Sequence, residues 1–229
     1  MPRDEHTLSP LGFNALKQKQ RALRAGFPSN MGLRVHRAIS WIGRAEQAED
    51  HDAAFIFYWI AFNSAYADEE RLGQACGGER AHFQEFFERL DALDEEGRLY
   101  RVVWERFQGP VRQLLENRYV FNPFWQHQNG VAGYEDWERR FLAAGRVMVR
   151  AIEDRDTATI LSLLFDRLYL LRNQILHGGT TWNSSTNRNQ VESGAEVLAA
   201  LVPVFADLML DHPHEEWGQP FYPVVTGGD

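Results

Sequence analysis

The sequence predicts an all-α protein. Apolar residues recur at helical spacing in most segments, glycines, prolines and capping residues separate those segments, and the alternation typical of half-buried strands is nowhere convincing. With 229 residues and 44% hydrophobic content, the chain is long enough to bury a full core. No linker or shift in composition divides it near the middle. We therefore expect an N-terminal arm at residues 1–30 and a single helical domain at residues 31–229 that ends in a tail.

The first elements are predicted from breakers, caps and apolar spacing. Residues 1–30 mix basic residues with Pro10, Gly26 and Pro28, which predicts an arm with one short helix at 15–24. Apolar residues at helical spacing predict a helix from about 32 to 49. Asp50 and Asp52 offer caps for a second helix at 53–67. Because apolar residues lie nearly all round this second helix, we expect it to be central and buried.

The middle of the chain is divided by glycine and proline. Gly77-Gly78 precedes an amphipathic helix at 79–93, and helical patterns at 99–107 and 111–116 lie on either side of Gly109-Pro110. The segment 119–130 is aromatic, and Pro123 with Asn129-Gly130 disfavours a regular helix. We expect an ordered loop there, with Trp125 as an anchor.

Three further segments complete the predicted fold. A helix is expected at 134–153, and a long one follows from a cap at Asp156-Thr157 to Leu176, where Gly178-Gly179 supplies a stop. Residues 180–189 are polar and predict an exposed loop. A last helix is expected at 191–210, before a tail that contains Trp217 and Phe221-Tyr222-Pro223.

Charge and cysteine content limit the classes of function. The formal net charge of -8 argues against broad, nonspecific binding to a nucleic-acid backbone, so any contact with RNA must be local. Cys76 is the only cysteine, which excludes an intrachain disulfide and fits a reducing compartment. The longest apolar run, residues 53–62, is too short to cross a bilayer, and the first residues lack an apolar signal core. We expect a cytoplasmic protein without a membrane partner.

The stretch from Arg172 to Gly179 carries the strongest indication of chemistry. Arg172 is a permanent cation whose planar fork can hold two phosphate oxygens, and His177 is an imidazole that exchanges a proton near neutrality. Together they suit cleavage of an RNA phosphodiester without metal, in which the 2′-hydroxyl attacks and a cyclic phosphate forms. Asn173 lies four residues before His177 on the same helix face and could hold the imidazole tautomer or a phosphate oxygen. A basic residue five positions before a histidine is expected by chance about once in such a chain.

The geometry of one helix does not bring this pair together. Arg172 and His177 lie about 140° apart on an ideal helix. Two copies around a two-fold axis would let each arginine meet the other copy's histidine, which predicts a composite site in a homodimer. The alternative is that Arg172 is an ordinary solvated residue and His177 a helix cap favoured by the dipole.

Three other polar residues have the chemistry for a role at the site or in a metal centre. Asn63 is polar within an apolar helix, so it needs a partner, and it could reach the motif helix to orient His177 or Asn173. His212 and His214 flank Pro213 on an expected surface tail and lack a tetrahedral partner set. We therefore expect neither a metal site nor a cofactor.

Two segments resemble the HEPN superfamily, the higher eukaryote and prokaryote nucleotide-binding domain. Arg172-Asn173-Gln174-Ile175-Leu176-His177 matches its Arg-Asn-x-x-x-His motif, and residues 57–66, with Trp59 and Asn63, are similar to the aromatic helix of bacterial members. Over residues 30–212 the resemblance implies an up-and-down helical bundle with additional helices. It also implies a homodimer with the motif at its interface and metal-independent ribonuclease activity in toxin–antitoxin, antiviral defence or RNA-processing systems.

The resemblance leaves two readings of function open. A toxin group within the superfamily carries a modified tyrosine two residues after the histidine, where this chain has Gly179. Control by adenylylation of that tyrosine is disfavoured, although a separate antitoxin or regulatory protein fits. The leading hypothesis is an endoribonuclease with Arg172 and His177 catalytic and with Asn173 and Asn63 supporting. The alternative is a non-catalytic HEPN module for nucleotide or RNA binding or for assembly.

Overall fold

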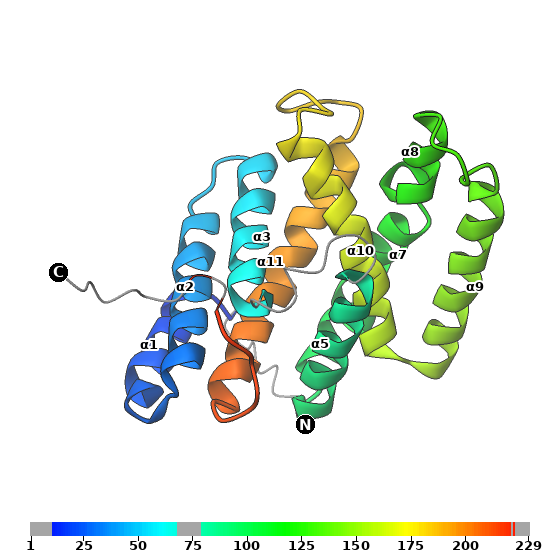
Figure 1. The fold of residues 1–229 in the computed structure, drawn as a ribbon. Helices are drawn as coiled ribbons and strands as arrows, with labels where there is room; N and C mark the ends of the chain where they lie inside the picture. Colours follow the sequence, from blue (N-terminus) through cyan, green and yellow to red (C-terminus); the bar gives the residue numbers. More distant parts are fainter. Residues whose placement is uncertain (1–10, 68–78, 221, 223–229) are drawn as a thin grey trace, which may run out of the picture.

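The computed structural model describes residues 11–67, 79–220 and 222, and every regular element within these ranges is a helix (Figure 1). The prediction of an all-α fold is confirmed. The predicted break at Gly77-Gly78, the lone Cys76, and Phe221 and Pro223 of the tail lie outside the described residues.

The first two helices pack side by side at one edge of the molecule (Figure 1). α1 (Phe13–Leu23) is followed by the 3₁₀ turn η1 (Arg24–Gly26) and by α2 (Ser29–Ala45). Leu16 of α1 is fully buried, and the Phe13 N–H donates to Glu46 Oε1 at 2.7 Å. Within the predicted arm, residues 13–23 therefore form a helix that packs against the bundle. α2 ends at Ala45, earlier than the predicted end near residue 49.

α3 (His51–Tyr66) is the buried central helix that its composition predicts. Its N-terminus is capped as expected, because Asp50 Oδ1 accepts a hydrogen bond from the Ala53 N–H at 2.8 Å. Phe55 and Phe62 are fully buried. The Phe62 ring lies 4.4 Å from that of Phe165, centroid to centroid. This aromatic contact joins α3 to the helix that carries the Arg172 motif.

The chain between residues 79 and 115 departs from prediction at one break. α5 (Glu79–Leu93) has its predicted bounds, and α6 (Arg98–Tyr100), the π-helical turn η2 (Arg101–Arg106) and α7 (Gln108–Leu115) follow. The break expected at Gly109-Pro110 falls instead at Phe107, where φ is -119° and ψ is 22°. Pro110 lies in the first turn of α7. Proline is tolerated there because the first N–H groups of a helix have no intrahelical partner.

The prediction of a loop at 119–130 is wrong. A short 3₁₀ turn, η3 (Arg118–Val120), leads into α8 (Asn122–Gln128), and Pro123 stands at the start of that helix. A proline at this position has a backbone angle already suited to a helix and loses no hydrogen bond. The helix does end at Asn129-Gly130. Trp125 acts as an anchor, because its Nε1 donates to the Tyr119 carbonyl at 2.7 Å.

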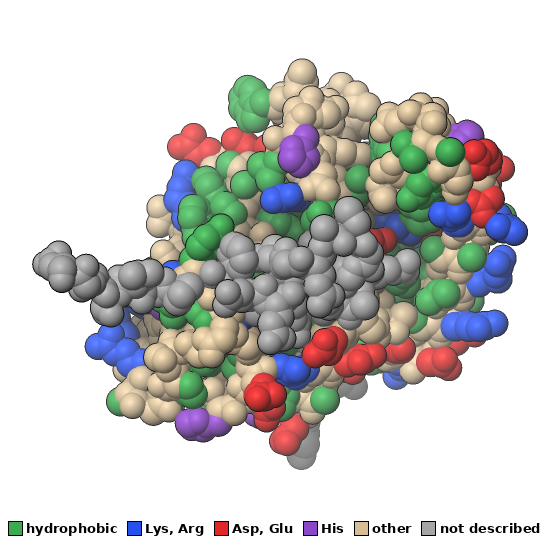
Figure 2. Space-filling model, viewed as in Figure 1, with side chains coloured by type: hydrophobic (Ala, Val, Ile, Leu, Met, Phe, Trp, Pro, Cys, Tyr) green, Lys and Arg blue, Asp and Glu red, His purple; other side chains and the backbone are tan. Residues whose placement is uncertain are grey.

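The last three helices are α9 (Trp137–Asp154), α10 (Thr157–Leu176) and α11 (Arg188–Asp211). α9 forms an outer edge (Figure 1), and basic side chains gather along that edge (Figure 2). α10 and α11 run in opposite directions and are joined by residues 177–187. The predicted cap of α10 is confirmed, because Asp156 Oδ1 accepts from the Thr159 N–H at 2.9 Å.

α11 is a long helix with a largely apolar composition. It is long and apolar enough to cross a membrane, yet 78% of its most apolar window is buried inside the protein. Pro203 lies within it and is buried as well. Its composition is therefore explained by its place in the core of the bundle.

A buried arginine ties the end of the described chain to the first helices. Arg34 of α2 is fully buried. Its guanidinium donates to three backbone carbonyls, those of Ala65 at 3.0 Å, Gly218 at 3.2 Å and Gln219 at 2.7 Å. Such charge-assisted bonds satisfy a cation that would otherwise be costly to bury. The segment after α11 is thereby fastened to α2 and α3.

Candidate functional site

The C-terminal end of α10 is closed by a glycine turn. Gly178 has a positive φ of 69°, and the Gly179 N–H donates to the Gln174 carbonyl at 2.8 Å. This is the Schellman arrangement, which needs a left-handed residue that glycine adopts without strain. The predicted stop at Gly178-Gly179 is confirmed. It leaves His177 as the last residue before the chain turns away.

His177 is exposed at this helix end. Its backbone N–H still bonds the Asn173 carbonyl at 3.0 Å, but its φ of -95° and ψ of 14° are no longer helical. The imidazole is therefore open to a ligand or to a second protein molecule.

Arg172 is half-buried, one and a half turns before His177. Its Nη1 donates to Asn173 Oδ1 at 2.8 Å, and its Nε is buried without a hydrogen-bond partner. The residue before it on the same face, Leu168, is fully buried. Arg172 thus continues the inner face of α10, and Asn173 holds part of its guanidinium.

The structure brings Arg172, Asn173 and His177 to one helix end but places Asn63 elsewhere. Asn63 follows Phe62, whose ring packs on Phe165. Phe165 precedes His177 by twelve residues, about 18 Å along a helix. The two helices run in opposite directions (Figure 1), so Asn63 lies towards the other end of the bundle from His177. A role for Asn63 in orienting His177 or Asn173 has no support in this arrangement.

Arg118 lies beside the motif, which the sequence could not indicate. Gln174 Nε2 donates to the Tyr119 carbonyl at 2.9 Å, which fastens the turn η3 to the last turns of α10. The Arg118 guanidinium lies 5.0 Å from the centroid of the Tyr119 ring and 5.7 Å from that of Phe124. Its Nη2 also donates to the Tyr119 hydroxyl at 3.0 Å. A second cation therefore stands near the Arg172 motif, stacked on aromatic rings.

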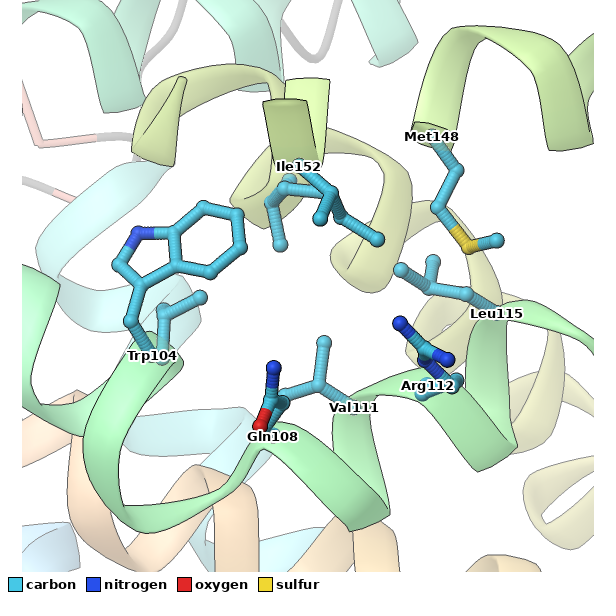
Figure 3. Close-up of a pocket in the computed structure, with 9 residues that line it drawn as sticks. Trp104, Gln108, Val111, Arg112, Leu115, Met148 and Ile152 are labelled. Carbon is cyan, nitrogen blue, oxygen red and sulfur yellow. The ribbon is translucent and has the colours of Figure 1, made fainter. Parts of the chain in front are cut away.

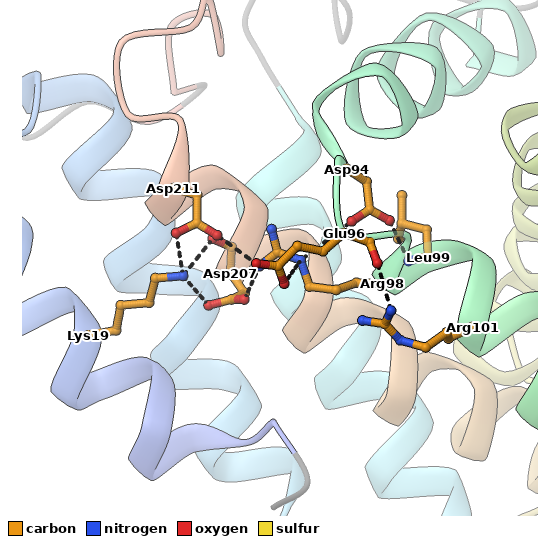
Figure 4. Close-up of polar contacts among 8 residues, drawn as sticks. All are labelled: Lys19, Asp94, Glu96, Arg98, Leu99, Arg101, Asp207 and Asp211. Atoms are coloured by element: carbon orange, nitrogen blue, oxygen red, sulfur yellow. Dashed lines mark hydrogen bonds and ion pairs between the residues drawn. The ribbon is translucent and has the colours of Figure 1, made fainter. Parts of the chain in front are cut away.

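The densest group of charges lies at the opposite end of α11. Lys19 Nζ lies 2.6 Å from both Asp207 Oδ1 and Asp211 Oδ1, and Arg98 contacts the same two carboxylates (Figure 4). Asp94 joins the network because its Oδ1 lies 3.4 Å from Arg98 Nε, and its Oδ2 accepts from the Leu99 N–H at 2.6 Å. Burial favours a higher pKa for Asp211, but the hydrogen bonds from Lys19 and Arg98 outweigh it and lower that pKa. The two cations, Lys19 and Arg98, balance the charge of the two carboxylates, Asp207 and Asp211. This arrangement fits a structural ion-pair network rather than a proton donor.

Two hollows within the described residues lie away from the motif. One cavity of about 20 Å³ lies between η2, α7, α9 and α10, lined by residues such as Trp104, Val111 and Met148 (Figure 3). That volume is close to the space of one water molecule and far below a typical ligand pocket. An open groove of about 540 Å³ runs along α9 beside the end of α7. Among the side chains of residues 11–67 and 83–220, no three of His, Cys, Asp or Glu are grouped as metal ligands.

Comparisons of the chain with protein-family models, with curated proteins and with solved structures found no match.

Proposed function

We propose that this chain is a metal-independent endoribonuclease of HEPN type that acts in the cytoplasm, in a toxin–antitoxin, antiviral defence or RNA-processing setting. One observation carries the proposal. Arg172, Asn173 and His177 lie at one helix end, where the imidazole is exposed and the guanidinium is held by its neighbour. A permanent cation and a group that exchanges protons near neutrality are what metal-free cleavage of RNA requires.

The proposed reaction is an internal transesterification. The ribose 2′-oxygen attacks the adjacent phosphorus, the bond to the 5′-oxygen breaks, and the products are a 2′,3′-cyclic phosphate and a 5′-hydroxyl. His177 takes the proton of the 2′-hydroxyl or delivers one to the leaving 5′-oxygen. Arg172 stabilises the additional negative charge on the pentavalent phosphorus.

A second copy of the chain completes the proposed site. Arg172 lies on the inner face of α10, whereas His177 is exposed just after the end of this helix. In a homodimer, the exposed histidine of one copy could therefore reach the arginine of the other copy. Large apolar side chains are exposed at this end: Leu176 is 49% and Trp182 74% exposed. Tyr119, whose carbonyl bonds Gln174, is 46% exposed. Exposed apolar side chains gathered at one place favour a protein contact.

The decisive experiment compares cleavage of mixed RNA by the wild type, Arg172→Ala and His177→Ala in the presence of EDTA. We expect products that end in a cyclic phosphate from the wild type, and a loss of at least about a hundredfold in each variant. His214→Ala and Arg150→Ala, which alter exposed residues elsewhere, serve as matched controls. Equal cleavage by all five proteins would reject the mechanism. RNA binding without cleavage would favour the non-catalytic module.

A further inference from the structure

Arg118 is an exposed cation that no acidic side chain neutralises. It lies at the surface of the protein, and none of the ion pairs among the described residues includes it. The formal net charge of the chain is -8, so carboxylates are more abundant than cations. A guanidinium that remains without one is available to an anion from outside the chain.

Two aromatic rings and a hydroxyl hold the Arg118 guanidinium in one place. It stacks near the rings of Tyr119 and Phe124, and its Nη2 donates to the Tyr119 hydroxyl at 3.0 Å. Phe124 is buried and is itself fixed, because its ring meets the Trp137 ring edge-on with centroids 5.0 Å apart. A long side chain that is already ordered loses less conformational entropy when it binds a ligand. The remaining N–H groups of this guanidinium have no acceptor within the described residues.

A hydrogen bond links this cation to the motif of the same chain. Gln174 Nε2 donates to the Tyr119 carbonyl at 2.9 Å, and Gln174 directly follows Asn173 in α10. Residues three apart are neighbours on a helix surface, with Cβ atoms about 5–6 Å apart, so Gln174 lies beside His177. α8, which follows the turn η3, lies at the same end of the bundle as the C-terminus of α10 (Figure 1). Arg118 therefore stands on the His177 side of the motif.

We propose that Arg118 binds a phosphate of the RNA strand beside the linkage that is cleaved, and that Tyr119 positions its guanidinium. The identification of the ligand as RNA rests on the proposed function. The planar fork of arginine matches two phosphate oxygens, and contacts with phosphates fix the register of a strand on a protein. Because both side chains are exposed, a strand can reach this site from solvent. Such a local contact needs no broad basic surface.

The test measures binding by the full chain of a short single-stranded 2′-O-methyl RNA, which lacks the attacking hydroxyl. Arg118→Gln is compared with Arg150→Gln, which removes the same charge from an exposed residue of α9. Arg150 lies near the start of α10, because α9 ends two residues before Asp156-Thr157, and so lies far from the motif. By fluorescence anisotropy we expect affinity to fall about tenfold in Arg118→Gln and less than about twofold in Arg150→Gln.

The salt dependence of binding reports the phosphate contact itself. Each phosphate neutralised on a single strand contributes about 0.7 to the slope of log affinity against log salt concentration. We expect this slope to become shallower by about 0.7 in Arg118→Gln and to stay unchanged in Arg150→Gln. Arg118→Lys keeps the charge but loses the fork, so it should retain the wild-type slope with an affinity between those of the wild type and Arg118→Gln.

Tyr119→Phe tests the positioning role, because it keeps the ring and removes only the hydroxyl that accepts from Arg118. We expect affinity to fall about threefold while the salt slope stays that of the wild type. Thermal melting of each variant checks that it is folded. An affinity of Tyr119→Phe equal to that of the wild type would overturn the role of the hydroxyl.

The remaining outcomes separate this site from the proposed function. Equal affinities and slopes in Arg118→Gln and Arg150→Gln would overturn the phosphate contact, even if cleavage depends on Arg172 and His177. A loss of affinity in Arg118→Gln with the wild-type slope would also overturn it, and would assign Arg118 to the fold or to a contact between protein chains. Binding that depends on Arg118 as expected, without cleavage by the wild type, would support the site and overturn only the nuclease. A wild type that binds no RNA would overturn both.

Discussion

Arg172 and Asn173 are adjacent in the sequence, and a side-chain hydrogen bond of 2.8 Å joins Nη1 of the first to Oδ1 of the second. Neighbours on a helix point about 100° apart, so the bond draws the guanidinium towards the face that Asn173 shares with His177. We therefore propose that Asn173 positions Arg172.

Substitutions of Asn173 should distinguish an effect on the position of the Arg172 guanidinium from an effect of added charge. Asn173→Ala removes the acceptor, and we expect the rate of cleavage at saturating RNA to fall about tenfold. Asn173→Asp keeps an oxygen at the same place, so this rate should stay within about threefold of the wild type, while the added charge weakens RNA binding. Single-turnover kinetics measure both quantities. Equal rates in Asn173→Ala and Asn173→Asp would contradict the positioning role.

Mixing two inactive variants tests whether the site is shared between copies. In a heterodimer of Arg172→Ala with His177→Ala, one composite pocket keeps both groups. Random exchange makes half of the dimers heterodimers with one good pocket of two, so the mixture should recover about a quarter of wild-type activity. Recovery is followed by RNA cleavage after the variants are mixed and allowed to exchange. A mixture as inactive as its components would place both groups of each site in one chain.

The proposed contact between copies should be sensitive to charge at Leu176. Leu176→Asp places a carboxylate among the exposed apolar side chains at the end of α10, where we expect the dimer to weaken at least tenfold. Leu142→Asp makes the same change at a leucine of α9 that is 63% exposed and should leave the dimer intact. Sedimentation equilibrium over a range of concentrations measures both. A stronger effect at Leu142 would move the interface to α9.

Gly194 should be intolerant of even one methyl group. Its missing Cβ leaves room for the Phe55 ring, whose nearest atom would lie only 2.9 Å away. Alanine would favour the helix by about 0.5–1 kcal/mol, but overpacking costs about 1–3 kcal/mol, so Gly194→Ala should destabilise the protein by about 1 kcal/mol. Gly145→Ala, where a Cβ meets nothing within 4 Å, should stabilise it by about 0.5 kcal/mol. Urea unfolding gives both values, and a stabilising Gly194→Ala would contradict the packing.

The ion-pair network around Asp211 should make stability depend on pH in the acid range. The lowered pKa of Asp211 means that its ionised form stabilises the fold above its unfolded pKa of about 3.9, and that this contribution is lost as the pH falls through the lower folded pKa. Because solvent screens this half-exposed carboxylate, Asp211→Asn should cost about 1 kcal/mol at pH 7. The difference from wild type in unfolding free energy should shrink below pH 4. A difference that is constant with pH would exclude the charge as its source.

Much of the fold follows from local signals, and the errors have a local cause. Both ends of α10 are predictable because Asp156 caps one and Gly178 terminates the other. The prediction of a loop at 119–130 is wrong because a proline disfavours a helix when it lies in the interior, whereas Pro123 stands at the start of α8. The presence of one proline in the sequence does not indicate whether it will lie at the start or in the interior of a helix.

Only those parts of the candidate site that are close together in the sequence can be predicted from it. The Arg172 motif and its helix end can be read from the sequence because they occupy eight consecutive residues. Arg118 is held near the motif because the backbone carbonyl of its neighbour Tyr119 accepts a hydrogen bond from Gln174, and every residue carries such a carbonyl. The polarity of Asn63 predicts that its side chain needs a hydrogen-bond partner, but it does not predict at which end of the bundle that partner lies.

The guanidinium of Arg34 gives the segment after α11 an importance that its irregular backbone does not suggest. A chain cut back to Asp211 would lose two of the carbonyl acceptors of this side chain, those of Gly218 and Gln219. Hydrogen bonds to a charged group contribute about 1.5–3 kcal/mol each, so their loss removes a large share of the stability of one domain. A minimal fragment of this protein therefore has to extend at least to Gln219, and a fusion partner is better joined after that residue than directly to the last helix.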